Sequence, residues 1–454
     1  MSLIHGSSPV VTIPELDLFD VTPTQTAVES EYCLDVRPIS TITANSVIEF
    51  VFGGESRDYI DLARSRLYAK LKLVHQDGTE LVIKKLKPDG TADPAGPAKD
   101  EEATPVNLSL HAMFNQIDIY INGVRMSQAS GMYPYKAMIQ TMLDNTADAK
   151  NTQLKAVGYK QETGKDLDAY SMTDPGIYWR HKLFRGSQSV EFEGPLLEDV
   201  LQVKRYLLNN LKVQIKLYPS QKQFYVMATD DTKDYKIVLE DIVFKACMVK
   251  VNPGIILGHA KAMETRNALY NYTKYETKSY SIPANQRTVY LDNLFQGTRP
   301  SKLIVAMVSS EGFNGAYKRN PFKFHHYDLS TIALIVDGET IPGRPMKLDF
   351  STGVAGQNFI EAYVNMYQAL GLSETDWGGA ITPEAYAQGH TLFVYTLDPA
   401  IRSGPYMSLT KHSNVRLELN FSNPLSETVT MLLVTKTPAV FEVDAARNVI
   451  LPNQ

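Results

Sequence analysis

The residues most capable of metal chemistry in this sequence form one short run, Phe324-His325-His326-Tyr327-Asp328, in which two imidazoles stand beside a carboxylate. Histidine and aspartate are both zinc ligands. Adjacent residues of a β-strand point to opposite faces, so His325 and His326 would not share an ion. We interpret the run as the entry to a strand, with one histidine buried and one in solvent. An enzyme of the cupin type would need two histidines separated by one residue, and the sequence has no such pair.

Three pairs of acidic residues could serve as general acid and base in a glycosidase, where two carboxyl groups stand about 5–10 Å apart across a cleft. They are Glu101-Glu102, Asp230-Asp231 and Glu240-Asp241. Such pairs are far more often solvated loop charge. The sequence has neither the G-x-S-x-G motif of serine hydrolases nor the H-E-x-x-H motif of zinc hydrolases. We therefore assign no catalytic residue and no metal ligand.

Two glycine pairs, Gly53-Gly54 and Gly378-Gly379, lack the Gly-Lys-Ser/Thr ending of a phosphate-binding loop. We interpret both as turns and assign no cofactor. The basic run Lys84-Lys85-Leu86-Lys87 could be a nuclear address or a nucleic-acid contact. A solvated strand end that discourages wrong pairing is the more economical interpretation.

Composition limits the function further. The 454 residues carry 45 basic and 50 acidic side chains, a net charge of -5, which predicts no sequence-specific binding to nucleic acid. Cys33 and Cys247 are the only cysteines, which argues against a disulfide framework or metal cluster and favours a reducing compartment. No run reaches the roughly 18 apolar residues of a membrane span, and the start lacks a secretory leader, so we expect a protein that is not membrane-embedded. The glycosylation triplets at Asn107, Asn271 and Asn420 are short enough to be chance matches.

Two segments far apart in the chain have similar sequences, and both are typical of β-hairpins. Residues 114–127 place Ile117, Ile119 and Ile121 before Asn122-Gly123, and residues 329–342 place alternating apolar residues before Asp337-Gly338. Asn-Gly and Asp-Gly between alternating runs are strong signals for tight hairpins.

The surrounding elements repeat in the same order. The run at 302–308 resembles the run at 67–74, residues 391–397 resemble the run that begins at Val190, and the run at 429–435 closes the series. Residues 414–421 parallel 210–217 position by position, an offset of 414 minus 210, or 204, whereas the hairpins are offset by 332 minus 117, or 215. After each hairpin apolar residues recur at helical spacing, at 135–143 and at 360–370. The second helix has Asn358 and Glu361 at capping-box spacing and Gly371 at its end.

The connections are long and polar. We expect an exposed loop over Lys84–Pro105, irregular structure over Asn145–Gly186, and an arm before about residue 30.

Many short strands without a strand-helix alternation exclude a doubly wound parallel sheet. Long excursions favour a jelly roll over an immunoglobulin-like sandwich. The sequence thus predicts an all-β chain of two tandem jelly-roll β-sandwiches with short helices in the loops: arm 1–30, first jelly roll 31–253, second jelly roll 254–440 and tail 441–454.

In three segments, residues 45–74, residues 105–127 with the helix that follows, and residues 415–434, the sequence resembles the double jelly-roll major capsid proteins of tailless icosahedral double-stranded DNA viruses. It is most similar to the Polinton and adintovirus type and more distantly to virophage capsid proteins. The resemblance covers about residues 45–434 as patterned segments, not as one signature motif.

The resemblance implies a structural protein without enzymatic activity. Three chains would form a pseudo-hexagonal homotrimer that tiles an icosahedral shell, with neighbouring capsomers, penton and other minor capsid proteins as partners. The resemblance implies that the protein is located in the virion capsid. It would be synthesised in the host cytoplasm, and assembly could take place in the nucleus. The alternatives are a two-domain β-sandwich protein that binds or cleaves carbohydrate, and a minor capsid or spike component.

Overall fold

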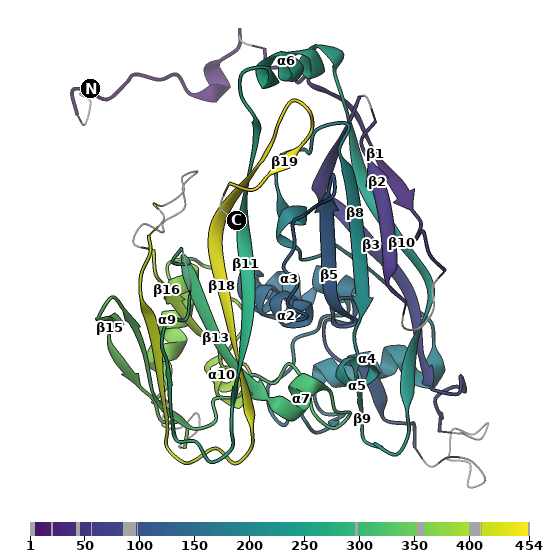
Figure 1. Ribbon diagram of the computed structural model, residues 1–454, viewed down its shortest axis with the longest axis vertical. Helices are drawn as coiled ribbons and strands as arrows, with labels where there is room; N and C mark the ends of the chain where they lie inside the picture. The colour runs from purple at the N-terminus through teal and green to yellow at the C-terminus, as the bar shows by residue number, and fades with distance from the viewer. Residues whose placement is uncertain are drawn as a thin grey trace.

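The computed structural model describes residues 5–19, 21–41, 46–55, 57–84, 97, 99–295, 298–351, 358–398, 409 and 411–452. Within them the chain forms two β-sandwiches, one from each half of the sequence, which stand side by side in Figure 1. This confirms the predicted all-β fold class.

The first sandwich contains two four-stranded antiparallel sheets, in the orders β1-β10-β3-β7 and β2-β8-β5-β6. Their bounds are β1 (Val28–Val36), β2 (Ile48–Gly53), β3 (Asp58–His75), β5 (Phe114–Ile121), β6 (Val124–Arg125), β7 (Val190–Gly194), β8 (Lys212–Pro219) and β10 (Tyr235–Val251). Burial alternates along β2 and β8 because every second side chain faces the core. A separate short ribbon pairs β4 (Ala103–Pro105) with β9 (Val226–Ala228).

The second sandwich repeats this arrangement, with the orders β11-β18-β13-β16 and β12-β17-β14-β15. Its strands are β11 (Ala268–Ile282), β12 (Thr288–Leu291), β13 (Lys302–Ser309), β14 (Leu329–Val336), β15 (Glu339–Lys347), β16 (Phe393–Thr396), β17 (Val415–Phe421) and β18 (Val429–Val443), and β19 (Val449–Ile450) pairs with the end of β18. Each sandwich thus orders its eight principal strands in the same way, the two-Greek-key pattern of a jelly roll.

The register of the two halves also matches. Ile121 pairs with Val213 in the first half and Val336 with Val415 in the second. A register shift follows the first residue of β5, between Phe114 and Gln116, and one follows the first residue of β14, between Leu329 and Thr331. The halves therefore share strand order, register and the place of an irregularity.

This pairing corrects one predicted offset. The hairpins are related by 215 residues as expected, but β8 and β17 are related by 415 minus 213, or 202, and not by 204. A slip of two residues keeps every side chain on the same face of the strand, so the alternating pattern could not detect it.

Both predicted hairpin turns are present, and they bind the neighbouring strand in the same way. Asn122 and Asp337 have φ of 47° and 51°, and the glycine after each is also left-handed. The Asn122 side-chain oxygen accepts the Lys212 N–H at 2.7 Å, and the Asp337 carboxylate accepts the Asn414 N–H at 2.8 Å. One turn side chain thus fixes the start of β8, and its counterpart fixes the start of β17.

The helices lie in the connections. They are α1 (Ser109–Ala112), α2 (Tyr133–Asp144), α3 (Ala147–Asn151), α4 (Pro175–Phe184), α5 (Lys222–Tyr225), α6 (Pro253–Met263), α7 (Ser310–Asn314), α9 (Ile360–Leu370) and α10 (Pro383–Gln388), with 3₁₀ turns η1 (Pro14–Leu16), η2 (Gln153–Val157), η3 (Arg185–Ser187) and η4 (Asp199–Gln202). The two predicted helices are α2 and α9. The predicted capping box at α9 is absent, since Phe359 is the N-cap and makes no side-chain cap, whereas Gly371 ends the helix in the left-handed conformation as expected.

Two predicted loops are more ordered than expected. The segment 145–186 contains α3, η2 and α4, and the prediction of irregular structure there is wrong. The loop 84–105 lies largely outside the described residues, but its last residues form the buried strand β4. The prediction that this end of the loop is exposed is wrong. The many charged residues of the loop indicated an exposed segment, but its last three residues pair with β9.

The cores of the two sandwiches are continuous. Buried apolar side chains of both halves form one cluster, and Figure 1 places α2 between the strands of the two sandwiches. All residues of α2 except Asp144 are buried. The helix packs on β5, and its Tyr135 packs on Phe313 and Phe322 of the second half. The described part of the arm, in contrast, leaves the body of the molecule in Figure 1, and its residues are exposed. The predicted domain boundaries near residues 30, 253 and 440 stay predictions.

Candidate functional site at the junction of the two sandwiches

The structure brings His325 and His326 together, and the prediction that they point to opposite faces is wrong. Their rings stack with centroids 4.3 Å apart, and His326 also stacks on Phe350. The pair lies in a turn before β14, where Tyr327 and Asp328 have positive φ, so strand geometry does not apply. Each Nδ1 accepts a backbone N–H from two residues ahead, at 2.8 and 2.9 Å.

Burial lowers the pKa of both histidines, that of His326 to about 3, so both are neutral at pH 7. Among the described residues no three potential ligands of the His, Cys, Asp or Glu type gather as a metal site would need. The small cavity beside His325 has a volume of about 220 Å³. Inside it, Lys323 contacts Asp168 at 2.7 Å and Arg319 contacts Glu427 at 3.2 Å. Asp168 comes from the first half, so this cavity belongs to a charged seam between the halves.

The three acidic pairs lie apart, and each binds cations or local backbone. The Glu101 side chain is 6% exposed and accepts hydrogen bonds from Lys233 at 2.8 Å and Tyr235 at 3.0 Å. Burial alone would raise the pKa of Glu101, but these hydrogen bonds lower it below its usual value.

The other two pairs lie at the surface. Asp231 contacts Lys318 at 2.8 Å and Glu240 contacts Lys72 at 3.5 Å. None of these carboxylates lines the cavity beside His325, the groove beside α6 or the hollow beside η4, whereas a glycosidase needs two carboxylates facing each other across a cleft.

The two glycine pairs have packing roles. A Cβ at Gly54 would stand 2.2 Å from the Asp58 carbonyl oxygen, which explains the glycine after β2. The carbonyl of Gly378 accepts the Ala147 N–H at 2.9 Å, and that of Gly379 accepts the Lys150 ammonium. Gly378 and Gly379 therefore join the second half to α3 of the first.

The remaining sequence candidates have structural explanations or lie outside the described residues. Lys84 donates its N–H to Asp100 at 2.8 Å, whereas Lys85, Leu86 and Lys87 are not among the described residues. Asn107 is buried, and its amide bonds the backbone of Lys160 in both directions, at 2.8 and 3.0 Å. A glycan on Asn107 would not fit the folded chain.

An aromatic cluster forms the apolar centre of the junction. Tyr135 of α2 stacks on Phe313 with centroids 5.4 Å apart and meets Phe322 edge-on at 5.8 Å. Phe224 of α5 packs against both Tyr135 and Phe322. Two rings come from each half, and aromatic pairs of this geometry add about 0.5–1.5 kcal/mol each beyond the burial of their area.

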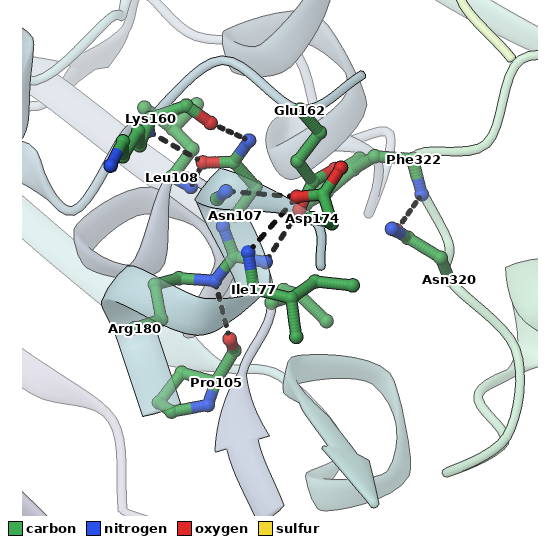
Figure 2. A network of polar contacts seen from close by, with 12 residues as sticks. Pro105, Asn107, Leu108, Lys160, Glu162, Asp174, Ile177, Arg180, Asn320 and Phe322 are labelled. Atoms are coloured by element: carbon green, nitrogen blue, oxygen red, sulfur yellow. Dashed lines mark hydrogen bonds and ion pairs between the residues drawn. The ribbon is translucent and has the colours of Figure 1, made fainter. Parts of the chain in front are cut away.

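A buried ion pair lies in the same region as Phe322 of this cluster, as Figure 2 shows. Arg180 of α4 is fully buried, binds the Glu162 carboxylate and donates from Nε to the Pro105 carbonyl at 3.0 Å. Asn320 from the second half approaches Glu162. Burial raises the pKa of Glu162 although Arg180 opposes the shift.

Asp174 positions this ion pair. Its carboxylate caps α4 by accepting the N–H groups of Gly176 and Ile177 at 2.8 and 3.1 Å. Its second oxygen accepts the Thr163 N–H at 2.9 Å, which fixes the segment that carries Glu162. Asp174 thus joins helix α4 to the segment 162–163 within the first half.

A second buried ion pair joins α2 to η4. Lys136 contacts Glu198 at 2.9 Å and Asp199 at 2.8 Å, and all three side chains are buried. Burial would lower the pKa of Lys136, but the two carboxylates raise it above its usual value, so the ammonium stays charged. Asp199 also accepts the Tyr275 N–H of β11 at 2.8 Å. This extends the pair into the second half.

More contacts fasten β11 and β18 to the first half. The Gln128 amide accepts the Thr277 N–H at 2.9 Å, and Asp144 accepts hydrogen bonds from Tyr275 and Lys436 at 2.7 Å each. The Tyr270 hydroxyl accepts the Leu208 N–H at 3.1 Å. These hydrogen bonds cross the junction and favour one relative orientation of the two sandwiches.

The sequence did not identify this junction. The sequence does not distinguish a buried lysine or arginine from a solvated one, so it gave no sign that Lys136 and Arg180 are buried. One signal was available: Asp174-Pro175 is a good N-cap followed by proline at the first helical position, and it predicts the start of α4.

Solved structures with the same arrangement of strands are viral coat proteins. In the cryo-EM structure of the Sputnik virophage, a chain matches with a TM-score of 0.60 and 12% identity, over 99% of this chain and 94% of that one. The PBCV-1 protein VP54 matches with a TM-score of 0.59 and 9% identity, over 96% and 99% of the two chains. The mavirus major capsid protein matches with a TM-score of 0.54 and 11% identity, over 99% and 96%. The chain therefore has the double jelly-roll fold of these proteins.

In sequence, the chain is similar to a curated protein of Caenorhabditis elegans, described as uncharacterized protein F54H12.2. The two are 26% identical over 434 residues, which cover 94% of this chain and 98% of the nematode protein. No protein-family model matches the sequence.

Proposed function

We propose that this chain is a non-enzymatic major capsid protein that forms homotrimers, and that these pseudo-hexagonal blocks tile an icosahedral virion shell. The observation that carries the proposal is the repeated jelly roll, with the same strand order and register in both halves and one buried junction between them. The match along nearly the whole length of viral coat proteins supports it.

The repeated fold explains the shape of the block. A ring of three identical chains closes through the same contact repeated around a three-fold axis. Because each chain contributes two similar sandwiches, the ring has six similar outer sides. Such a block can meet six neighbours in a flat layer, which a trimer of single sandwiches cannot do equally well.

The junction supplies the rigidity that tiling needs. If the two sandwiches turned relative to each other, the six sides of the block would lose their regular spacing. The aromatic cluster and the buried pairs Glu162–Arg180 and Lys136–Glu198 oppose such a rotation. Breaking either pair would leave an uncompensated buried charge.

The N-terminal arm supplies a surface for a second copy of the chain. Its apolar side chains lie in solvent in the single chain, with Val10, Leu18 and Phe19 exposed by 86%, 75% and 95%. Glu15 and Asp17 make this segment acidic. Exposed apolar residues in such density mark an interaction site.

A groove suited to that segment lies beside α6. It has a volume of about 790 Å³ and apolar lining from Ile255, Met263 and Leu269. Lys204, Arg205 and Arg266 also line it and complement the acidic arm. Because Ala27 and Val28 at the root of the arm line the same groove, two adjacent copies could exchange arms there. We propose this exchange as a contact between neighbouring capsomers.

The finer features follow from the same proposal. The chain divides into arm 1–30, jelly rolls 31–253 and 254–440, and tail 441–454, and it works in a virion with penton and minor capsid proteins. Assembly follows synthesis in the host cytoplasm and can take place in the nucleus. Among these viruses we propose the Polinton or adintovirus type, because the three sequence segments resemble that type most. In the described part of the chain, each helix is too short or too polar to cross a bilayer.

Sedimentation of the purified chain tests the proposal. We expect a stable species with three times the 50.7 kDa mass of one chain, and larger particles as the protein concentration rises. A species that stays monomeric under all assembly conditions would overturn the trimer and with it the capsid function.

A further inference from the structure

The only two cysteines of the chain lie directly opposite each other on neighbouring strands. In the register of β1 and β10, Cys33 faces Cys247, between the pairs Tyr32–Met248 and Leu34–Ala246. Both thiols are free. The sequence separation of the two residues conceals this arrangement, which only the pairing of the first and last strands of the sandwich creates.

The pair is of the non-hydrogen-bonded type. The Cys247 N–H donates to the Ser65 hydroxyl at 3.0 Å, and Ser65 belongs to β3, on the side of β10 away from β1. The N–H and C=O of one strand residue point to the same side, so Cys247 makes no ladder bond to Cys33. Residues opposed in this way have Cα atoms about 4.5 Å apart with side chains close together. That separation lies within the range of natural disulfides, about 4.4–6.8 Å.

Access to the two thiols is unequal. Cys33 is exposed, whereas Cys247 is 4% exposed. Arg64 and Glu31 form an ion pair between β3 and β1 near the two cysteines. Burial raises the pKa of the Cys247 thiol, which lowers its reactive thiolate fraction relative to an ordinary cysteine. A reagent from solution therefore meets Cys33 first.

We propose that Cys33 and Cys247 are a disulfide site, which closes when the protein meets a low-molecular-weight disulfide such as oxidised glutathione. The Cys33 thiolate attacks one glutathione sulfur, forms a mixed disulfide and releases one reduced glutathione, which takes up the proton that Cys33 lost. The Cys247 thiolate then attacks the Cys33 sulfur and releases the second glutathione, which takes up the Cys247 proton. Both cysteines are oxidised, and one glutathione disulfide is reduced to two thiols.

The bond would fasten the least protected strand of the first sandwich. β1 is an edge strand, and the side chains between its two ends are exposed. It also carries the N-terminal arm. A covalent link to β10 opposes fraying of β1, and it restricts the unfolded chain between residues 33 and 247. A protein made in a reducing compartment would thus acquire the link on leaving it. This inference does not depend on the capsid proposal.

Oxidation of the native protein by oxidised glutathione tests the site. Non-reducing mass spectrometry of the denatured product should show one chain lighter by two hydrogen atoms, and one proteolytic fragment should contain both cysteines. The midpoint of thermal unfolding should rise by several degrees, and the β1 amides should exchange hydrogen more slowly. Reduction should reverse all three changes.

Matched variants complete the experiment. Cys247→Ser should stop at the mixed disulfide on Cys33, and Cys33→Ser should resist oxidation while folded, since its remaining thiol is buried. Neither variant should gain thermal stability. Two free thiols after oxidation of the wild-type chain, a stable glutathione adduct on it, or covalent dimers through Cys33 would each overturn the proposal.

Discussion

At the scale of single residues, buried charge decides how the two sandwiches are joined. Arg180 is fully buried, and its ion pair with Glu162 lies where Asn320 of the second half approaches. A buried pair of this kind adds little net stability over an apolar replacement, but the loss of one partner leaves the other charge uncompensated. The Glu162–Arg180 pair therefore contributes more to selecting one packing arrangement of the two halves than to the net free energy of unfolding.

Arg180→Met should lower the free energy of unfolding by about 3–5 kcal/mol, because Glu162 stays buried without its cation. Glu162→Gln should cost a similar amount, whereas the double variant Arg180→Met/Glu162→Gln should cost much less than the two together. Denaturant unfolding measures each value. Arg57→Met, which breaks the exposed pair with Glu29, is the control and should cost less than about 1 kcal/mol. Additive losses in the double variant would contradict a coupled buried pair.

Buried histidines predict the response to acid. His111 is fully buried, forms a hydrogen bond between Nδ1 and the Tyr133 hydroxyl (2.7 Å), and has its pKa lowered by burial from 6.5 to about 3. The unfolded chain binds this proton below about pH 6.5, whereas the folded chain resists it. The stability from neutral His111 is therefore present above pH 6.5 and is lost as the pH falls toward 3.

His111→Gln keeps an acceptor for Tyr133 but removes the titrating group. The wild-type chain should be more stable at pH 7.5, and this advantage should shrink by up to about 1.4 kcal/mol per pH unit as the pH falls below 6. Unfolding free energies across that range provide the measurement, with His5→Gln as an exposed control. Parallel curves for wild type and His111→Gln would show that His111 does not titrate in this way.

At the scale of elements, the hairpin turns define the register of both sandwiches. Asn122 holds the start of β8 through the Lys212 N–H, and Asp337 holds the start of β17 in the same manner. Both residues also tolerate the left-handed backbone that the turn requires.

Asn122→Ala should lower the free energy of unfolding by about 1–3 kcal/mol, since the Lys212 N–H loses its acceptor and alanine is strained at positive φ. Asn122→Asp is the matched variant, because aspartate performs this role at residue 337. It should cost less than the alanine change. Chemical denaturation of the three proteins gives the comparison. Equal losses for alanine and aspartate would mean that the side-chain acceptor is not what holds β8.

Element by element, the sequence predicted the repeated strands, both hairpins, and helices α2 and α9, because alternation and turn residues are local signals. Sequence reasoning did not predict helix α4 or the burial of β4, because the charged residues and prolines in and around these elements are also common in loops. The wrong offset between β8 and β17 has a different cause, since period-two patterns do not distinguish registers two residues apart. The stacking of His325 on His326 was not predicted, because the sequence did not reveal that the two residues lie in a turn.

At the scale of the whole molecule, the junction depends on contacts between residues far apart in sequence, such as Tyr135 with Phe322 and Gln128 with Thr277. No local pattern encodes which buried surface of one half meets the other. The repeat predicted two sandwiches and the start of the chain predicted an arm, whereas only the structure revealed that the two sandwiches share one continuous core.

The arm should govern contact between capsomers and not formation of the trimer. Leu18→Asp/Phe19→Asp should leave the trimer mass unchanged and reduce association of trimers at least tenfold, because charge replaces the apolar anchor. Light scattering against concentration measures both. Thr22→Asp adds charge to the same segment without removing apolar surface and should have a smaller effect. Arg266→Glu, on the wall of the groove, should weaken association as well, and its failure to do so would exclude that groove as the receptor.

Cryo-electron microscopy of the purified protein tests the central claim most directly. The account predicts particles with three-fold symmetry, six sandwiches around the axis and a pseudo-hexagonal outline, together with curved sheets or closed shells of these blocks at higher concentration. Isolated single chains in every image, or rings in which the two sandwiches of a chain do not occupy similar places, would contradict it.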